Sequence, residues 1–313
     1  MKQSAIDYPR ASMDIYPSRV RDYMALLKPR VMSLVIFTGL CGMLVAPGQV
    51  HPFIALIAIL CIAMGSGAAG AINMWYDRDI DAIMQRTSQR PIPKQLIAPA
   101  EALHFGVFLS AASVFLMLVV VNYVAAALLA AAILYYVVIY TMWLKRKTPQ
   151  NIVIGGAAGA FPPMIGWAAI TGSISVDSVI LFLIIFMWTP PHFWALSLFR
   201  AGDYTKANIP MLPVVRGRRV TQNHIMIYTL LLIPITLVPS WLGHSGMLYL
   251  IMATVLGLRF IQLSYKVYRH DREVDAKKLF GFSIMYLFLL FLALVLDHVI
   301  DAPLMNWIGD IHA

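Results

Sequence analysis

Three oxygen-bearing side chains, Asn73, Asp77 and Asp81, follow one another at a spacing of four residues near the end of an apolar segment. If that segment is a helix that continues through Asp81, the three side chains share one face and lie roughly 6 Å apart along its axis. Mg²⁺ prefers hard oxygen ligands and commonly joins one or two carboxylates to substrate phosphates. We therefore predict that these residues bind Mg²⁺ against a diphosphate. The alternative is a solvated helix end paired with Arg78.

Three basic residues, Arg86, Arg90 and Lys94, lie within nine residues of one another just after the acidic stretch. An allylic diphosphate reacts by losing pyrophosphate, which leaves negative charge on the departing group and positive charge on carbon. Basic side chains and Mg²⁺ stabilise the first charge, and arginine can do so through two parallel hydrogen bonds. The predicted catalytic residues are Asn73, Asp77, Asp81, Arg86 and Arg90, with Lys94 as a binding residue.

The composition excludes a soluble globular protein of this length. Mean hydropathy is +0.75, 60% of the residues are hydrophobic and only 12% are charged. Apolar runs of about 17 to 25 residues are long enough to cross a bilayer as helices. We predict an all-α membrane protein with nine transmembrane helices around a central cavity and with catalytic loops on the cytoplasmic side. The predicted spans are 31–47, 52–75, 102–121, 123–144, 150–171, 176–199, 223–243, 246–266 and 279–299.

The basic residues predict the orientation of these spans. All 24 Lys and Arg residues fall before the first span, after an even-numbered span, or at the inner end of the eighth. Such residues collect on the cytoplasmic side, so we expect a cytoplasmic N-terminus and a periplasmic C-terminus. The first 22 residues resemble neither a cleavable signal peptide nor an acid-poor transit peptide, which favours a bacterial inner membrane. The net charge of +9 is then a stripe facing anionic lipid, with no role in binding nucleic acid. The predicted parts are a cytoplasmic polar tail (1–22), the nine-helix domain (23–300) and a periplasmic tail (301–313).

Two long cytoplasmic loops, about 76–101 and 200–222, are basic and contain proline. Each follows an even-numbered span, which suggests a weak pseudo-repeat with one catalytic loop in each half. Between them, the fifth span contains Gly155, Gly156 and Gly159, followed by the pair Pro162–Pro163. These small residues indicate either close helix packing or room for a large, flat substrate.

The motif Asn73-x3-Asp77-x3-Asp81, followed by Arg86-Thr-x2-Arg90-Pro, resembles the first motif of the UbiA superfamily of intramembrane prenyltransferases. Nine spans fit that superfamily. Three further stretches are more specific, and they resemble the haem-prenylating branch of the superfamily. The resemblance covers roughly residues 22–300. These stretches are 148–167, Thr189-Pro-Pro-His-Phe-Trp-Ala-Leu196, and Asp203-Tyr204 with Ile209-Pro-Met-Leu-Pro-Val-Val215.

The second loop departs from the superfamily pattern at one position. Many members carry a second Asp-x3-Asp pair there, whereas Phe199 stands four residues before Asp203. The resemblance therefore implies that other residues of this half take over part of the diphosphate or porphyrin binding. The residues expected to do so are His192, Arg200, Asp203, Tyr204 and Lys206.

The resemblance implies that farnesyl passes from farnesyl diphosphate to the C2 vinyl group of haem B, with addition of water, to form haem O for terminal oxidases. Haem B would be a substrate and Mg²⁺ the cofactor, with haem A synthase or oxidase assembly factors as further partners. One alternative is prenylation of an aromatic acceptor such as 4-hydroxybenzoate. Another is a secondary transporter, whose acids would lie near the bilayer midplane rather than at a helix end.

Overall fold

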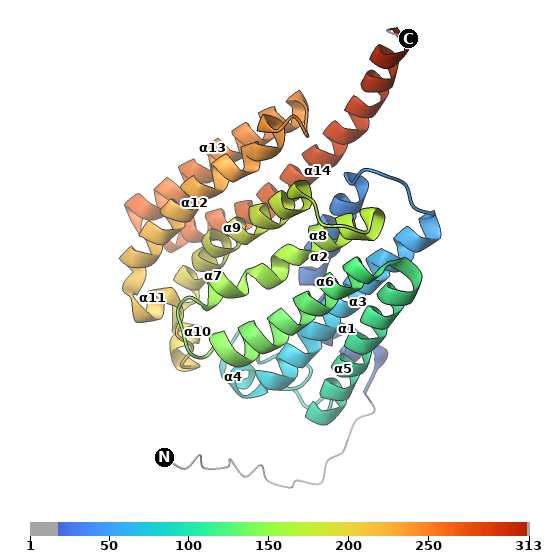
Figure 1. Ribbon diagram of the computed structural model, residues 1–313. Helices are drawn as coiled ribbons and strands as arrows, with labels where there is room; N and C mark the ends of the chain where they lie inside the picture. The colour runs from blue at the N-terminus through green and yellow to red at the C-terminus, as the bar shows by residue number, and fades with distance from the viewer. Residues whose placement is uncertain (1–17, 312–313) are drawn as a thin grey trace.

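The computed structural model describes residues 18–311, with side chains described through residue 300. In this range the chain is helical, with turns and no β-strand (Figure 1). The helices are α1 Val20–Leu26, α2 Pro29–Leu44, α3 Pro52–Tyr76, α4 Arg78–Ile83, α5 Pro99–Leu116, η1 Met117–Val121, α6 Tyr123–Leu134, η2 Tyr135–Leu144, α7 Asn151–Gly155, α8 Ala157–Thr171, α9 Val176–Phe199, α10 Ala201–Lys206, α11 Leu212–Val215, α12 Gly217–Trp241, α13 Met247–His270 and α14 Glu273–Ile311. The elements η1 and η2 are π-helical continuations of α5 and α6.

The predicted spans are confirmed as helices. Eight helical stretches of the described chain are long and apolar enough to cross a membrane, and the bent pair α1–α2 is the ninth candidate. Each predicted span falls on one of them. Large apolar side chains remain exposed along the outer helices, for example Phe108 and Phe115 on α5, as expected where a helix faces lipid. The chain is therefore an all-α, multi-pass membrane protein.

The first span is broken near its start. Lys28 has a left-handed backbone (φ 53°) and Pro29 begins α2, so that α1 and α2 meet at 60°. Proline cannot donate the next helical hydrogen bond, which explains why one helix ends and another begins here. Helix α1 begins at Val20, three residues before the predicted boundary of the domain. The break brings Lys28 to the end of α3.

Helices α2 and α8 cross at very short range. A Cβ added to Gly42 would lie 2.1 Å from the carbonyl oxygen of Pro163, and one added to Gly166 would lie 2.0 Å from that of Gly39. Only glycine permits such backbone contact, so these residues serve helix packing. Helix α8 continues through Pro163, and the interruption of the fifth span lies at Gly156 instead.

The loops with functional residues gather at one end of the bundle, where α4, α10 and α11 lie near one another (Figure 1). Contacts between distant segments hold this end together. Arg146 after η2 binds Asp79 of α4 at 2.7 Å, and Arg218 of α12 binds Asp271 after α13 at 2.8 Å. Helix α14 continues to Ile311, so much of the predicted C-terminal tail is an extension of the last helix. Most of the predicted N-terminal tail, residues 1–17, lies outside the described residues.

Candidate active site

The acidic motif keeps its helical repeat where α3 ends. Helix α3 stops at Tyr76 and α4 begins at Arg78, but backbone bonds from Asp77 to Asn73 (2.9 Å) and from Asp81 to Asp77 (2.8 Å) continue the four-residue ladder. The expected alignment of the three side chains is confirmed. All three are buried, with exposed fractions of 3% for Asn73, 0% for Asp77 and 1% for Asp81. A solvated helix end is thereby excluded.

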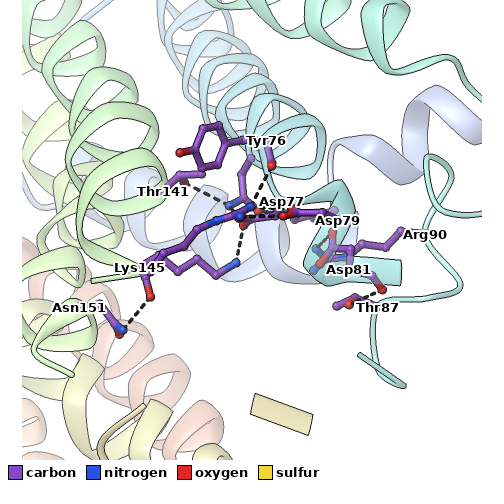
Figure 2. Close-up of polar contacts among 12 residues, drawn as sticks. Tyr76, Asp77, Asp79, Asp81, Thr87, Arg90, Thr141, Lys145 and Asn151 are labelled. Carbon is purple, nitrogen blue, oxygen red and sulfur yellow. Dashed lines mark hydrogen bonds and ion pairs between the residues drawn. The ribbon is translucent and has the colours of Figure 1, made fainter. Parts of the chain in front are cut away.

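Asp77 lies at the centre of the site (Figure 2). Its Oδ2 accepts hydrogen bonds from Lys145 Nζ and from Asn73 Nδ2, the latter at 2.7 Å. Its Oδ1 lies 3.4 Å from a guanidinium nitrogen of Arg146. Two cations from the end of η2 thus face one fully buried carboxylate. Such charge-assisted bonds compensate the loss of hydration that burial imposes on the carboxylate.

Asn73 connects this carboxylate to two other helices. Its Oδ1 accepts a hydrogen bond of 2.7 Å from Lys28 Nζ, and its Nδ2 also donates to Thr141 Oγ1 of η2 at 3.1 Å. Lys28 reaches the site because of the bend between α1 and α2. The first span therefore supplies a cation to a site that the sequence places at the end of the second.

Asp81 is bound by the loop that follows it. Arg90 donates to its Oδ2 at 2.6 Å, and the hydroxyl of Thr87 donates to its backbone carbonyl at 3.1 Å. The structure thus brings Arg90, one of the predicted phosphate-binding residues, to the acidic face. Lys94 is exposed on the same loop.

Asp79, between the two buried acids, points outward and binds both terminal nitrogens of Arg146 at 2.7 Å. Burial alone would raise the pKa of the Asp79 carboxyl, but the hydrogen bonds and charge of Arg146, with backbone amides, hold this pKa below its usual value. The guanidinium also stacks 5.0 Å from the Tyr76 ring centre. These residues, with Trp75 and Arg78, line a surface pocket of about 350 Å³.

The second long loop contacts the first through Tyr204 of α10. This residue is buried, and burial raises the pKa of its hydroxyl, while the charge and hydrogen bond of Arg86 partly offset the increase. Apolar residues of both loops form one small core. Its buried members are Ile80, Met84, Ile152, Tyr204, Ala207, Ile209 and Met211, with Phe193 and Val214 packed against them. Arg86 and Tyr204 are thereby brought together from the two loops.

The other predicted residues of the second loop are less tightly bound. One oxygen of Asp203, Oδ2, is buried without a hydrogen-bond partner among the described residues, and so is Nε of Arg200. The Arg200 guanidinium lies 6.0 Å from the ring centre of Phe199. Lys206, at the end of α10, is exposed. A buried oxygen and a buried N–H without partners are suited to bind a polar ligand group.

His192 faces α14. Its Nδ1 lies 2.7 Å from Ser283 Oγ, and its ring stacks against Trp188 and Phe280 with centre distances of 4.3 and 4.7 Å. Its contacts thus run into the core of the second half of the bundle. The ring of Phe193, in contact with His192 at 5.1 Å, belongs to the loop core that contains Tyr204.

Sequence reasoning missed three of the cations at the acidic motif: Lys28, Lys145 and Arg146. The basic run after the fourth span was attributed to topology alone. The spacing of Lys145 and Arg146 gave no signal, because their partner Asp77 lies 68 and 69 positions earlier in the sequence. Lys28 likewise reaches Asn73 only through the left-handed bend between α1 and α2.

The site has the charge pattern of an anion-binding site that also holds a cation. Four cations, on Lys28, Arg90, Lys145 and Arg146, contact the amide and the two carboxylates. The carboxylates provide hard oxygens for a divalent ion, and the basic groups provide donors for phosphate oxygens. All lie at one end of the membrane-spanning helices. The arrangement suits a lipid-soluble substrate that carries a diphosphate.

Comparison with known proteins agrees with this geometry. The family model described as the UbiA prenyltransferase family matches residues 35–295. A protein named protoheme IX farnesyltransferase, from Parvibaculum lavamentivorans, is 59% identical over 284 residues, covering 90% of this chain and 89% of that protein. One of the same name from Rhizobium rhizogenes is 56% identical over 293 residues, covering 92% of each.

Solved structures share the fold. A digeranylgeranylglyceryl phosphate synthase structure matches with a TM-score of 0.75 and 20% identity, over 89% of this chain and 98% of that one. A UbiA homologue from Archaeoglobus fulgidus, bound to GPP and Mg²⁺, matches with a TM-score of 0.61 and 15% identity, over 88% and 99% of the two chains.

Proposed function

The chain belongs to the UbiA prenyltransferase family, and from this premise we propose that it transfers farnesyl from farnesyl diphosphate to the C2 vinyl group of haem B, with addition of water, to form haem O. The observation that carries this proposal is the 59% identity, over nine-tenths of the chain, to a protein named protoheme IX farnesyltransferase. Haem B is here a substrate. Haem O would then pass to terminal oxidases, with haem A synthase or oxidase assembly factors as partners.

The diphosphate is proposed to bind at the cations around the acidic motif. Lys28, Lys145 and Arg146 come from two spans, and Arg90 comes from the loop, so together they can enclose a phosphate group. Their charge stabilises the pyrophosphate as the bond between its oxygen and C1 of the farnesyl chain breaks. Arg86, Lys94, Arg200 and Lys206 are proposed to add charge at the rim of the same site.

Mg²⁺ is proposed to bind at Asp77 and Asp81, with the Oδ1 of Asn73 as a further ligand. No group of three acidic, histidine or cysteine side chains closes around a metal among residues 18–300. That fits Mg²⁺, which takes one or two carboxylates and completes its shell with water and phosphate. When bound, the ion supplies positive charge to the phosphate oxygens. Since Lys145 and Arg90 pair with these carboxylates in the described structure, they are placed to turn toward the diphosphate instead.

The reaction needs an electron-rich acceptor near C1 of the donor. The vinyl group supplies the electron pair of the new carbon–carbon bond, the cation left beside the porphyrin takes up a water oxygen, and that water loses a proton. Tyr204 and Asp203 are proposed to border this reaction from the second loop. The buried, unpartnered Oδ2 of Asp203 supports a ligand-binding role.

The orientation in the membrane follows from the basic end of the bundle. We propose that this end is cytoplasmic, that the N-terminal tail lies inside, that residues 301–313 lie in the periplasm, and that the membrane is the inner membrane of a bacterium. The cations in contact at this end come from the N-terminal segment, the first loop, the end of η2 and α12. That distribution agrees with the rule that Lys and Arg stay on the cytoplasmic side.

The proposal is tested by incubating membranes that contain the chain with haem B and isotope-labelled farnesyl diphosphate. Mass analysis of the haem pool should show haem that has gained one labelled farnesyl group and one hydroxyl group. Membranes without the chain, and membranes with the double variant Asp77→Asn/Asp81→Asn at equal abundance, should show none. If the haem stays unlabelled and the label passes to added 4-hydroxybenzoate instead, the acceptor is an aromatic compound and not haem.

A further inference from the structure

We propose that Nε2 of His192 coordinates the iron of the haem substrate, an inference that rests on the proposed function and assigns the residue that holds the porphyrin. The imidazole ring is held on three sides. Trp188 covers one face at 4.3 Å with planes 18° apart, Phe280 covers the other at 4.7 Å and 24°, and Ser283 Oγ holds Nδ1 at 2.7 Å. His192 is 8% exposed, and Nε2 is the ring nitrogen that these contacts leave without a partner.

Hydrogen bonds around Ser283 determine which ring nitrogen carries the proton. The Ser283 hydroxyl has one hydrogen and donates it to the carbonyl of Phe280 at 2.7 Å. Its oxygen must therefore accept from His192, so that Nδ1 is the N–H nitrogen of the imidazole. Nε2 then carries a lone pair, and it has no hydrogen-bond partner among residues 18–300. The side chain presents a free nitrogen donor.

The surroundings keep the imidazole neutral. The groups in contact with the ring are aromatic rings and a hydroxyl, and none of these carries the negative charge that a buried imidazolium needs. A neutral imidazole is the form that binds metals. Histidines that ligate metals almost always donate their other N–H to a fixed acceptor, which sets the tautomer and the ring orientation. Ser283 is that acceptor here, and it acts as a positioning residue.

The position of His192 suits a porphyrin that must meet the prenyl donor. The neighbouring residue, Phe193, packs against the core shared by the two loops, which contains Ile80 and Met84 of the acidic segment. An iron held by His192 would therefore sit in the second half of the bundle, beside the loops that bind the diphosphate. Trp188 also donates from Nε1 to the carbonyl of Ser283 at 2.8 Å, which fixes α9 against α14. His192 on α9 and Ser283 on α14 are thus held in a fixed position relative to each other.

Resonance Raman spectroscopy of the full-length protein in detergent, with ferrous haem B and no prenyl donor, tests this inference. The wild-type protein, labelled with ¹⁵N-histidine, should show an iron–imidazole stretching band that shifts with the isotope. His192→Gly should lose the band, and added imidazole should restore it. His224→Gly is the matched control, because His224 also bonds through Nδ1, to the Val220 carbonyl at 2.8 Å, and it should keep the band.

A second variant keeps the test valid if His192→Gly does not fold. Ser283→Ala should lower the frequency of the band and weaken haem binding about tenfold, whereas Ser283→Thr should retain both. Two results would overturn the inference. One is an isotope-sensitive band that persists in His192→Gly, and the other is a wild-type protein that binds haem but shows no such band. Haem O formation is measured separately in membranes. A His192-dependent band without haem O supports the ligand and contradicts the proposed reaction, while haem O without any such band contradicts the ligand alone.

Discussion

An ion pair between Lys145 and Asp77 joins the end of η2 to the end of α3 across 68 positions of the sequence. The carboxylate is fully buried and the lysine side chain is 16% exposed. A buried carboxylate that loses its partner pays the full cost of its desolvation, so this lysine stabilises the site in the absence of substrate. It also lies at the site proposed for the diphosphate, where the charge of a leaving pyrophosphate would have to be neutralised.

Lys145→Met, which keeps most of the side-chain volume but removes the charge, should reduce kcat/KM for farnesyl diphosphate about 10²–10³-fold. The reason is the loss of one positioned cation at the leaving group. Steady-state transfer with the amount of folded protein measured in parallel checks this prediction. Lys147→Met, at an exposed position two residues away, serves as the control and should transfer normally. Equal rates in the two variants would remove Lys145 from the site.

Substitution of the two buried acids, Asp77 and Asp81, should reduce transfer far more than substitution of Asp79, which points outward. Asp77→Asn and Asp81→Asn should each abolish transfer, since both carboxylates are proposed to bind Mg²⁺. Asp79→Asn should lower the rate at most about tenfold, because this side chain is half-exposed and acts only by orienting Arg146. Initial rates of the three variants, measured over a range of Mg²⁺ concentrations, check this order of effects. Full activity of the wild-type protein in excess chelator would show that no metal is required.

The sequence predicted those features that depend on local spacing. The nine spans follow from hydropathy, because lipid requires every backbone polar group to be bonded within the helix. The common face of Asn73, Asp77 and Asp81 follows from the helical repeat, and it persists through the junction between α3 and α4. Both inferences need only neighbouring residues.

The features that sequence reasoning missed come from distant segments. Lys28 and Asn73 are 45 residues apart, and the hydroxyl that orients His192 lies 91 residues away on α14. Nothing in the spacing of these residues reveals their contact. Membrane topology alone explains why cations collect near the acidic motif, and only the side-chain geometry shows that Lys145 and Arg146 contact Asp77.

Arg90→Ala should raise the apparent KM for farnesyl diphosphate more than that for haem, because Arg90 pairs with Asp81 at 2.6 Å on the side proposed for the donor. Arg90→Lys should give an intermediate effect, since lysine keeps the charge without the paired donors of arginine. Arg78→Ala is a suitable control, because Arg78 stacks on Trp75 at 5.6 Å and is exposed. A change confined to the KM for haem would move this loop to the acceptor side.

The pair of Asp79 and Arg146 should make a small contribution to stability that depends on pH. Because the folded protein holds the pKa of Asp79 below its usual value of 3.8, the contribution is complete above that value and is lost as pH falls through the lowered pKa. The difference in Tm between the wild-type protein and Asp79→Asn should be at most about 3 °C at pH 7, since such an exposed pair contributes about 0–1 kcal/mol. It should shrink toward zero below pH 3.8. A Tm difference that grows on acidification would contradict the assignment.

The contact between Tyr204 and Arg86 should couple the two loops. Tyr204→Phe keeps the ring in the shared core but removes the hydroxyl that interacts with Arg86, so we expect normal protein abundance and a fall in kcat of about 10-fold. Tyr204→Ala also empties part of the core and should lower stability by about 2–5 kcal/mol in addition. Combining Tyr204→Phe with Arg86→Met should cost little more than the worse single variant, because both remove the same interaction. The measurement is the transfer rate of the wild-type protein, the variants Tyr204→Phe and Arg86→Met, and the double variant. If the rate reduction of the double variant equals the product of the two single reductions, the contact does not couple the two loops.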